Sequence, residues 1–188
     1  MKSLRAVLVL SLLLLVAGCI PSVHPLYTGK DLLFEPALVG TWASKDGGEV
    51  WTVARGAGDV YNLDSREKDG NDVKTGKFEM RFFKVAGQGF VDFFPVEADS
   101  KRTYFYEAHT LPVHTFLRVR EMGKVLKLEM LDPEWLKKLF KENPDALKHE
   151  VVRDGILLTA QPTDLQAFVT KYAEVKGAWT ALEPLEKQ

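Results

Sequence analysis

The chain has 188 residues, with 25 Lys and Arg against 26 Asp and Glu and a formal net charge of −1 at pH 7. One cysteine excludes an internal disulfide framework and a cysteine-based zinc site. Basic and acidic residues are mixed along the chain, so we expect a solvated surface and no nucleic-acid partner. The fold must therefore depend on an apolar core, and the roughly 150 residues after Val39 are enough to form one.

The first 18 residues have the pattern of an export signal. Lys2 and Arg5 precede a largely apolar segment, residues 6–16, which ends in the small pair Ala17–Gly18. A helix that spans a bilayer needs about 20 apolar residues, and this segment is shorter. We therefore expect residues 1–18 to be a signal peptide that is removed, rather than a membrane anchor.

The residues Val16–Ala17–Gly18–Cys19 resemble the lipobox of bacterial lipoproteins. The resemblance implies that Cys19 becomes the first residue of the mature protein and carries a diacylglycerol thioether and an N-acyl chain such as palmitate. Two or more acyl chains give stable membrane attachment. Ile20 stands where an aspartate would retain such a protein in the inner membrane, so in a Gram-negative cell the resemblance implies the periplasmic face of the outer membrane. An ordinary secretory peptide with an incidental cysteine is the alternative.

Three prolines interrupt the segment that follows, Pro21, Pro25 and Pro36, and no regular period runs through it. This pattern is typical of an extended tether or of a strap laid on a folded body. We expect the lipid anchor and tether to occupy residues 19–38 and a single folded domain to occupy residues 39–188.

Short runs of aromatic and β-branched residues begin at Val39 and are separated by glycine-bearing turns, a pattern that predicts strands. Leu126, Leu128 and Met130 alternate with Lys127 and Glu129, so one face of such a strand is buried and the other is solvated. The expected strands are residues 39–43, 49–54, 60–64, 77–85, 90–94, 103–108, 113–120, 125–131 and 156–160.

Two short helices are expected, at residues 132–142 and 163–173. Asp132 can cap the first, because Pro133 suits the first helical position. In the second helix, Thr163 and Gln166 have the spacing of a capping box.

This order of elements predicts a mainly β fold, a single antiparallel barrel of about 8–9 strands, because closure removes unpaired edges. A two-sheet sandwich is the alternative. Gly40–Thr41–Trp42 resembles the Gly-x-Trp element of lipocalin-like barrels, which implies that Trp42 plugs one end of the barrel. Residues 24–42, 90–93 and 111–116 together resemble a group of poorly characterised bacterial lipoproteins, a resemblance that implies no activity.

No nucleophile elbow, phosphate loop or metalloprotease motif is present, so the sequence predicts neither an enzyme nor a cofactor. Glu107, His109 and His114 are the group that most suggests a metal site, and Pro112 between the two histidines counts against it. Histidines in hydrogen-bonded structural positions are the alternative.

Apolar side chains of the expected strands are candidates to line a ligand cavity. They are Phe78, Met80, Phe82, Phe90, Phe94, Leu117 and Leu128. An eight-stranded barrel is barely wide enough for one small ligand, and a solid core is the alternative. The sequence thus favours an envelope lipoprotein that binds a hydrophobic small molecule, and a solid-core lipoprotein that docks an envelope protein is the alternative.

Overall fold

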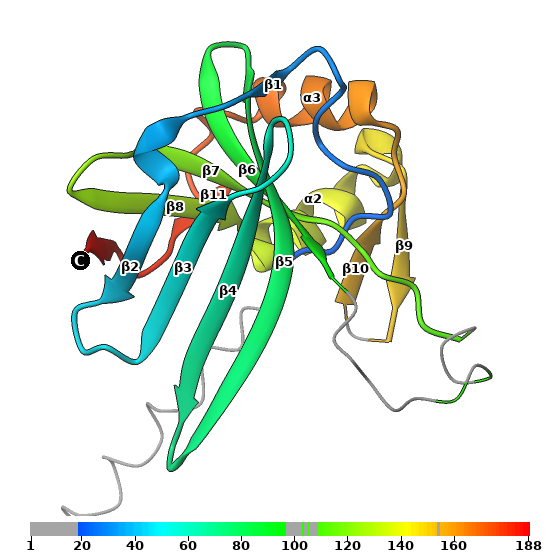
Figure 1. Ribbon diagram of the computed structural model, residues 1–188. Coiled ribbons are helices and arrows are strands. Elements are labelled where there is room, and N and C mark those ends of the chain that lie inside the picture. The colour runs from blue at the N-terminus through cyan, green and yellow to red at the C-terminus, as the bar shows by residue number, and fades with distance from the viewer. Residues whose placement is uncertain (1–18, 97–102, 104, 106–108, 154) are drawn as a thin grey trace, which may run out of the picture.

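The computed structural model describes residues 19–188, apart from residues 97–102, 104, 106–108 and 154. Among the described strands, eight close an antiparallel barrel in the order β5-β4-β3-β2-β12-β8-β7-β6, and β6 pairs with β5 to complete the ring (Figure 1). They are β2 (Gly40–Ser44), β3 (Glu49–Arg55), β4 (Val60–Asp69), β5 (Asp72–Val85), β6 (Gln88–Pro95), β7 (Thr115–Glu121), β8 (Val125–Leu131) and β12 (Leu185–Lys187). The expected mainly β barrel is confirmed, and the sandwich alternative is excluded.

The remaining elements lie outside the ring. Strand β1 (Leu32–Leu33) pairs with β5, and β11 (Trp179–Ala181) pairs with β8. A separate hairpin is formed by β9 (His149–Val152) and β10 (Gly155–Leu158). The helical elements of the described chain are α2 (Pro133–Glu142), α3 (Pro162–Lys171) and the short 3₁₀ turns η1 (Pro36–Leu38) and η2 (Pro144–Ala146).

The strand predictions hold best where apolar alternation is strong. Strand β8 has the expected bounds, whereas β4 and β5 extend well beyond theirs into a polar hairpin (Figure 1). The expected strand at residues 103–108 falls on residues that lie outside the described part of the chain, apart from Thr103 and Phe105. The strand expected at residues 156–160 exists as β10, but its expected place in the barrel is wrong. It pairs with β9 in a separate sheet.

The helix starts differ in how well the sequence predicts them. Asp132 caps α2 as expected, because its carboxylate accepts the backbone N–H of Trp135 at 2.8 Å. The expected capping box of α3 is wrong: the helix begins one residue earlier at Pro162, and its N-cap, Gln161, makes no capping hydrogen bond through its side chain. The side-chain amide of Gln166 instead bonds to Leu26 and Asp31, which precede the barrel.

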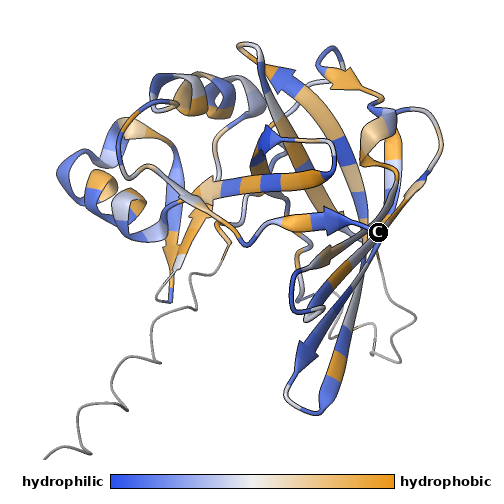
Figure 2. Cartoon of the chain, turned by 90° about the vertical axis from the view of Figure 1, so that its left-hand side faces the viewer, coloured by the Kyte–Doolittle hydropathy of each residue, from blue (hydrophilic) through white to orange (hydrophobic). Residues whose placement is uncertain are grey.

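Two apolar clusters lie on opposite sides of the barrel wall, since side chains alternate along each strand. Figure 2 shows hydrophobic and hydrophilic residues alternating along several of these strands. The inner cluster lies inside the barrel and contains Leu38, Trp42, Val53, Tyr61, Leu63, Met80, Phe82, Val91, Phe93, Leu117, Leu126, Leu128, Met130 and Leu185. The outer cluster joins the wall to the helices and to the β9–β10 hairpin. Its wall side includes Phe83, Phe90 and Leu131, and its helical side includes Leu136 and Phe168.

The segment before the barrel, residues 20–34, is a strap that lies on the outer cluster. Leu26 is fully buried in that cluster, and Ile20 and Tyr27 pack against it. Two backbone hydrogen bonds of 2.8 Å join Ser22 to His114 across the barrel surface. Of the two forms that the sequence left open, the described residues adopt the strap rather than a free tether.

Candidate functional site

The barrel interior holds most of the side chains that the sequence offers as ligand-lining. Met80, Phe82, Leu117 and Leu128 belong to the inner cluster, and Phe78 packs against it. These five side chains point inward because they occupy alternate positions of β5, β7 and β8.

Phe90 and Phe94 do not point into the barrel with them. Phe90 belongs to the outer cluster, and the ring of Phe94 lies 4.6 Å from that of His114. In β6 the inward positions are instead Val91 and Phe93. The run Phe90–Val91–Asp92–Phe93–Phe94 is apolar on both faces except for Asp92, so its apolar residues alone do not reveal which of them face the interior.

The inner cluster includes large side chains that are almost completely buried. Trp42 and Tyr61 are fully buried, and Met80 is 1% exposed. The indole N–H of Trp42 donates to the carbonyl of Leu38 at 2.8 Å, and the backbone N–H of Glu35 donates to the Tyr61 hydroxyl oxygen. These contacts join the chain around η1 to the buried aromatic rings. The polar atoms of both rings therefore have hydrogen-bond partners within the protein.

A second set of aromatic residues is less completely covered. Trp51 and Phe78 are partly buried and pack against the inner cluster, and both rings meet Phe93 edge-on, with centroid distances of 5.4 and 6.5 Å. The Trp51 indole N–H donates to the Glu49 carboxylate at 2.7 Å. These two rings are among the partly exposed apolar side chains that border the inner cluster.

Residues from three segments that the sequence singles out, residues 24–42, 90–93 and 111–116, meet on the outside of the barrel. Asp92, 1% exposed, is the centre of this contact. One of its carboxylate oxygens lies 2.7 Å from Nδ1 of His114, and the other accepts the backbone N–H of Leu26 at 3.3 Å. We call Asp92, His114 and Leu26 the clasp, because they join the strap to β6 and to the start of β7.

Burial raises the pKa of Asp92 above its usual range, although its hydrogen bonds with His114 and Leu26 act in the opposite direction. Desolvation disfavours the charged carboxylate, whereas a hydrogen bond to the charged form favours it. The ring of His114 is itself enclosed, with the ring of Tyr27 at 6.4 Å and a side chain that is only 12% exposed. The pair therefore serves as a buried polar link inside the protein.

A second link holds the strap from the helix side. The side-chain amide of Gln166, in α3, donates to the carbonyl of Leu26 at 3.0 Å and to the carboxylate of Asp31 at 2.7 Å. That carboxylate also accepts the backbone N–H and the hydroxyl of Thr28, at 2.7 and 2.6 Å. The strap is thus bonded to the barrel on one side and to α3 on the other.

The metal-site hypothesis receives no support from these positions. His114 is paired with Asp92, and Nδ1 of His109 lies 2.6 Å from the carbonyl oxygen of Phe105. Glu107 lies outside the described residues. In the described part of the chain, no three His, Cys, Asp or Glu residues come together as metal ligands would.

Cys19 is exposed at the start of the described chain, three residues before the Ser22 bridge. Within residues 19–188, leaving the undescribed positions aside, no helix is both long and apolar enough to cross a bilayer. No protein-family model, curated protein or solved structure matches this chain.

Proposed function

We propose that this chain is an exported cell-envelope lipoprotein, anchored through acyl chains on Cys19, whose barrel is a solid body that docks other components of the envelope. The anchor rests on the sequence: a basic start, a short apolar segment and a lipobox-like ending at Cys19. In a Gram-negative cell, Ile20 after the cysteine favours the outer membrane.

The observation that favours docking over ligand transport is the near-complete burial of large side chains inside the barrel. Trp42, Tyr61 and Met80 are at most 1% exposed, and the polar atoms of Trp42 and Tyr61 bond to the protein itself. Side chains alone can fill the interior of an eight-stranded barrel. A barrel that carries a ligand would instead leave an apolar cavity for it.

Intact-mass measurement of the protein isolated from its own host tests the anchor. We expect the mass of residues 19–188 plus a diacylglycerol and an N-acyl chain. A free thiol on Cys19, or an uncleaved residue 1–18 segment, would contradict the proposal. The control is Cys19→Ser, which should stay uncleaved or soluble and should incorporate no labelled palmitate.

Native mass spectrometry of residues 19–188 carrying Cys19→Ser tests the solid barrel. Every member of the inner and outer clusters lies after residue 19, so this part retains the whole described core. We expect the bare protein mass after purification from its host. A lipid or other apolar molecule that remains bound would contradict the proposal that the barrel holds no ligand.

A second candidate function is the binding of a hydrophobic small molecule, and the partly exposed pair Trp51 and Phe78 beside Phe93 favours it. Such a ligand would enter where these rings meet solvent. Uptake of a fluorescent apolar probe that is lost in Trp51→Ala but retained in Trp135→Ala would support this function. Trp135, on α2, packs against the outer cluster and serves as the matched control.

A further inference from the structure

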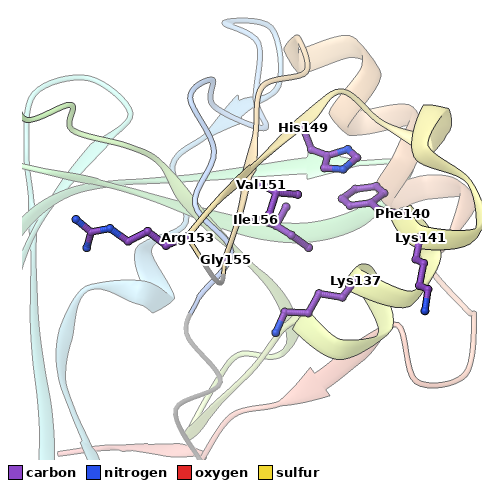
Figure 3. Close-up of a pocket in the computed structure, with 8 residues that line it drawn as sticks. All are labelled: Lys137, Phe140, Lys141, His149, Val151, Arg153, Gly155 and Ile156. Atoms are coloured by element: carbon purple, nitrogen blue, oxygen red, sulfur yellow. The ribbon is translucent and has the colours of Figure 1, made fainter.

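The β9–β10 hairpin carries exposed apolar side chains beside its turn. Val151 is 72% exposed and Val152 is 51% exposed, on neighbouring positions of β9 that point to opposite sides. Between this hairpin and α2 lies an open hollow of about 280 Å³. Its apolar surface is made by Phe140, Ile156 and Val151, with His149 stacked on Phe140 at a ring distance of 3.7 Å (Figure 3).

Cationic side chains surround this apolar surface. Lys137 and Lys141 line the hollow from α2, and Arg153 lines it from the hairpin turn, while no acidic residue is part of the described lining. Lys137 is paired at 2.8 Å with the exposed Glu134. Lys141 and Arg153 have no ion-pair partner among the residues that the structure describes.

The three cations extend in different directions from the rim of the hollow (Figure 3). A site for one small anion needs cations that converge on it. Cations that spread outward around exposed apolar groups instead suit an extended anionic surface, because long basic side chains can place their stems on apolar material and their charges at the interface.

The strap brings Cys19 to this same end of the molecule. Ser22 pairs with Leu158 in a parallel bridge, since Leu158 N–H donates to Pro21 and Val23 N–H donates to Leu158, both at 2.9 Å. Because the two segments run in the same direction, the chain before Ser22 leads back toward the Gly155 end of β10. Cys19 is three residues before Ser22, as Gly155 is three residues before Leu158.

We infer that Val151, Val152 and Arg153 of the hairpin and the adjoining edge of α2 form a membrane-contact face that binds the anionic phospholipid headgroups of the bilayer in which Cys19 is anchored. This inference rests on the proposed lipid anchor. Val151 and Val152 enter the headgroup boundary, and Lys137, Lys141 and Arg153 contact lipid phosphates. The groups that meet the bilayer are then the acylated residue and the residues next to it in space.

Vesicle sedimentation of residues 19–188 with Cys19→Ser tests the face without the acyl chains. We expect binding to vesicles of equimolar phosphatidylglycerol and phosphatidylcholine, and much weaker binding to phosphatidylcholine alone. Each basic residue near an anionic surface contributes on the order of a fivefold gain in binding, so the loss of three such charges weakens binding on the order of a hundredfold. Reversing Lys137, Lys141 and Arg153 to Glu adds repulsion and should weaken binding by more than that. Raised salt should weaken binding as well, because these charges are exposed.

A matched variant carries Lys45→Glu, Lys84→Glu and Lys124→Glu, which makes the same change in net charge at exposed positions that do not line the hollow. It should lose much less affinity than the triple variant of the face. Val151→Ser with Val152→Ser, which changes only exposed positions, should also weaken binding to the anionic vesicles. Circular dichroism of every variant checks that the barrel remains folded.

Three results would overturn the inference: equal binding by the two triple variants, equal binding to both kinds of vesicle, or loss of vesicle binding when millimolar inorganic phosphate is added. The last result would make the face a site for small soluble anions. The intact mass of the native protein reports separately on the acyl anchor, so a missing anchor and an inactive contact face give different outcomes.

Discussion

The clasp offers a direct test of how the strap is held. Asp92→Ala removes the carboxylate that bonds to both His114 and the backbone N–H of Leu26, at 2.7 and 3.3 Å. Each buried polar group left without a partner costs about 1–3 kcal/mol, so we expect Asp92→Ala to lower the free energy of unfolding by about 3 kcal/mol. Asp92→Asn keeps an oxygen for Leu26 and should cost less.

Equilibrium unfolding in urea measures both variants, and amide hydrogen exchange shows where the loss falls. Because Leu26 is fully buried against the outer cluster, we expect protection to fall first at the strap and at the residues around Ser22. A loss below about 1 kcal/mol for Asp92→Ala, with unchanged strap protection, would refute the view that this carboxylate holds the strap.

The pH dependence of the same measurement tests the state of Asp92. Burial raises its pKa, so the folded protein binds this proton more tightly than the unfolded chain does. The stability that this group contributes is complete below the ordinary aspartate pKa of about 3.9 and is lost as pH rises through the raised value. Relative to the wild type, Asp92→Asn should therefore become progressively more stable as pH rises from about 4, until the carboxyl is fully ionised. A difference in the free energy of unfolding that stays constant with pH would contradict the raised pKa. The control repeats both pH profiles in the presence of His114→Gln, and it shows whether the imidazole causes the change.

Three further predictions concern the strap, the barrel and the anchor. Gln166→Ala removes the hydrogen bonds to Leu26 and Asp31, so urea unfolding should show a loss of about 1–2 kcal/mol, whereas the exposed neighbour Ala167→Gly tests helix propensity alone. Trp42→Ala leaves a void in the inner cluster and should cost about 3–5 kcal/mol in thermal or urea unfolding; a cost under about 1 kcal/mol would mean that the ring is not packed there. Cys19→Ala should release any protein that is cleaved after Gly18 into the soluble fraction of cells, and a cleaved variant that stays in the membrane would contradict acylation as the anchor.

The barrel could be predicted because apolar and polar residues alternate clearly in the sequence of a strand that has one buried face. Residues 125–131 alternate without interruption, and β8 has those bounds. The polar ends of β4 and β5 have no apolar face to mark them, so the long hairpin that they form was not expected. Strand β12, which closes the ring between β2 and β8, has only three residues, too few for a period to be read.

The clasp could not be read from the sequence for a different reason. Asp92 lies in an aromatic run, and its partners are 22 and 66 residues away along the chain. Only the register of β6 against β7, and the path of the strap across them, brings these groups together. The resemblance of residues 24–42, 90–93 and 111–116 to a group of bacterial lipoproteins was the one available signal, because it marked the three segments whose residues meet there.

The way in which the strap is held has a consequence for an anchored protein. An extended chain covers at most about 3.6 Å per residue, so Cys19 stays within about 11 Å of Ser22, which is bonded to both β10 and His114. With acyl chains on Cys19, as proposed, the barrel is held close to the bilayer with little freedom to turn. Loss of the clasp and of the Gln166 bonds would leave the Ser22 bridges and the β1–β5 pairing as the remaining attachments of the strap. The strap would then be held less firmly, and the anchored body could tilt on the membrane. A polarised-fluorescence measurement of the acylated protein on a supported bilayer should therefore show a broader range of orientations in Asp92→Ala combined with Gln166→Ala than in the wild type.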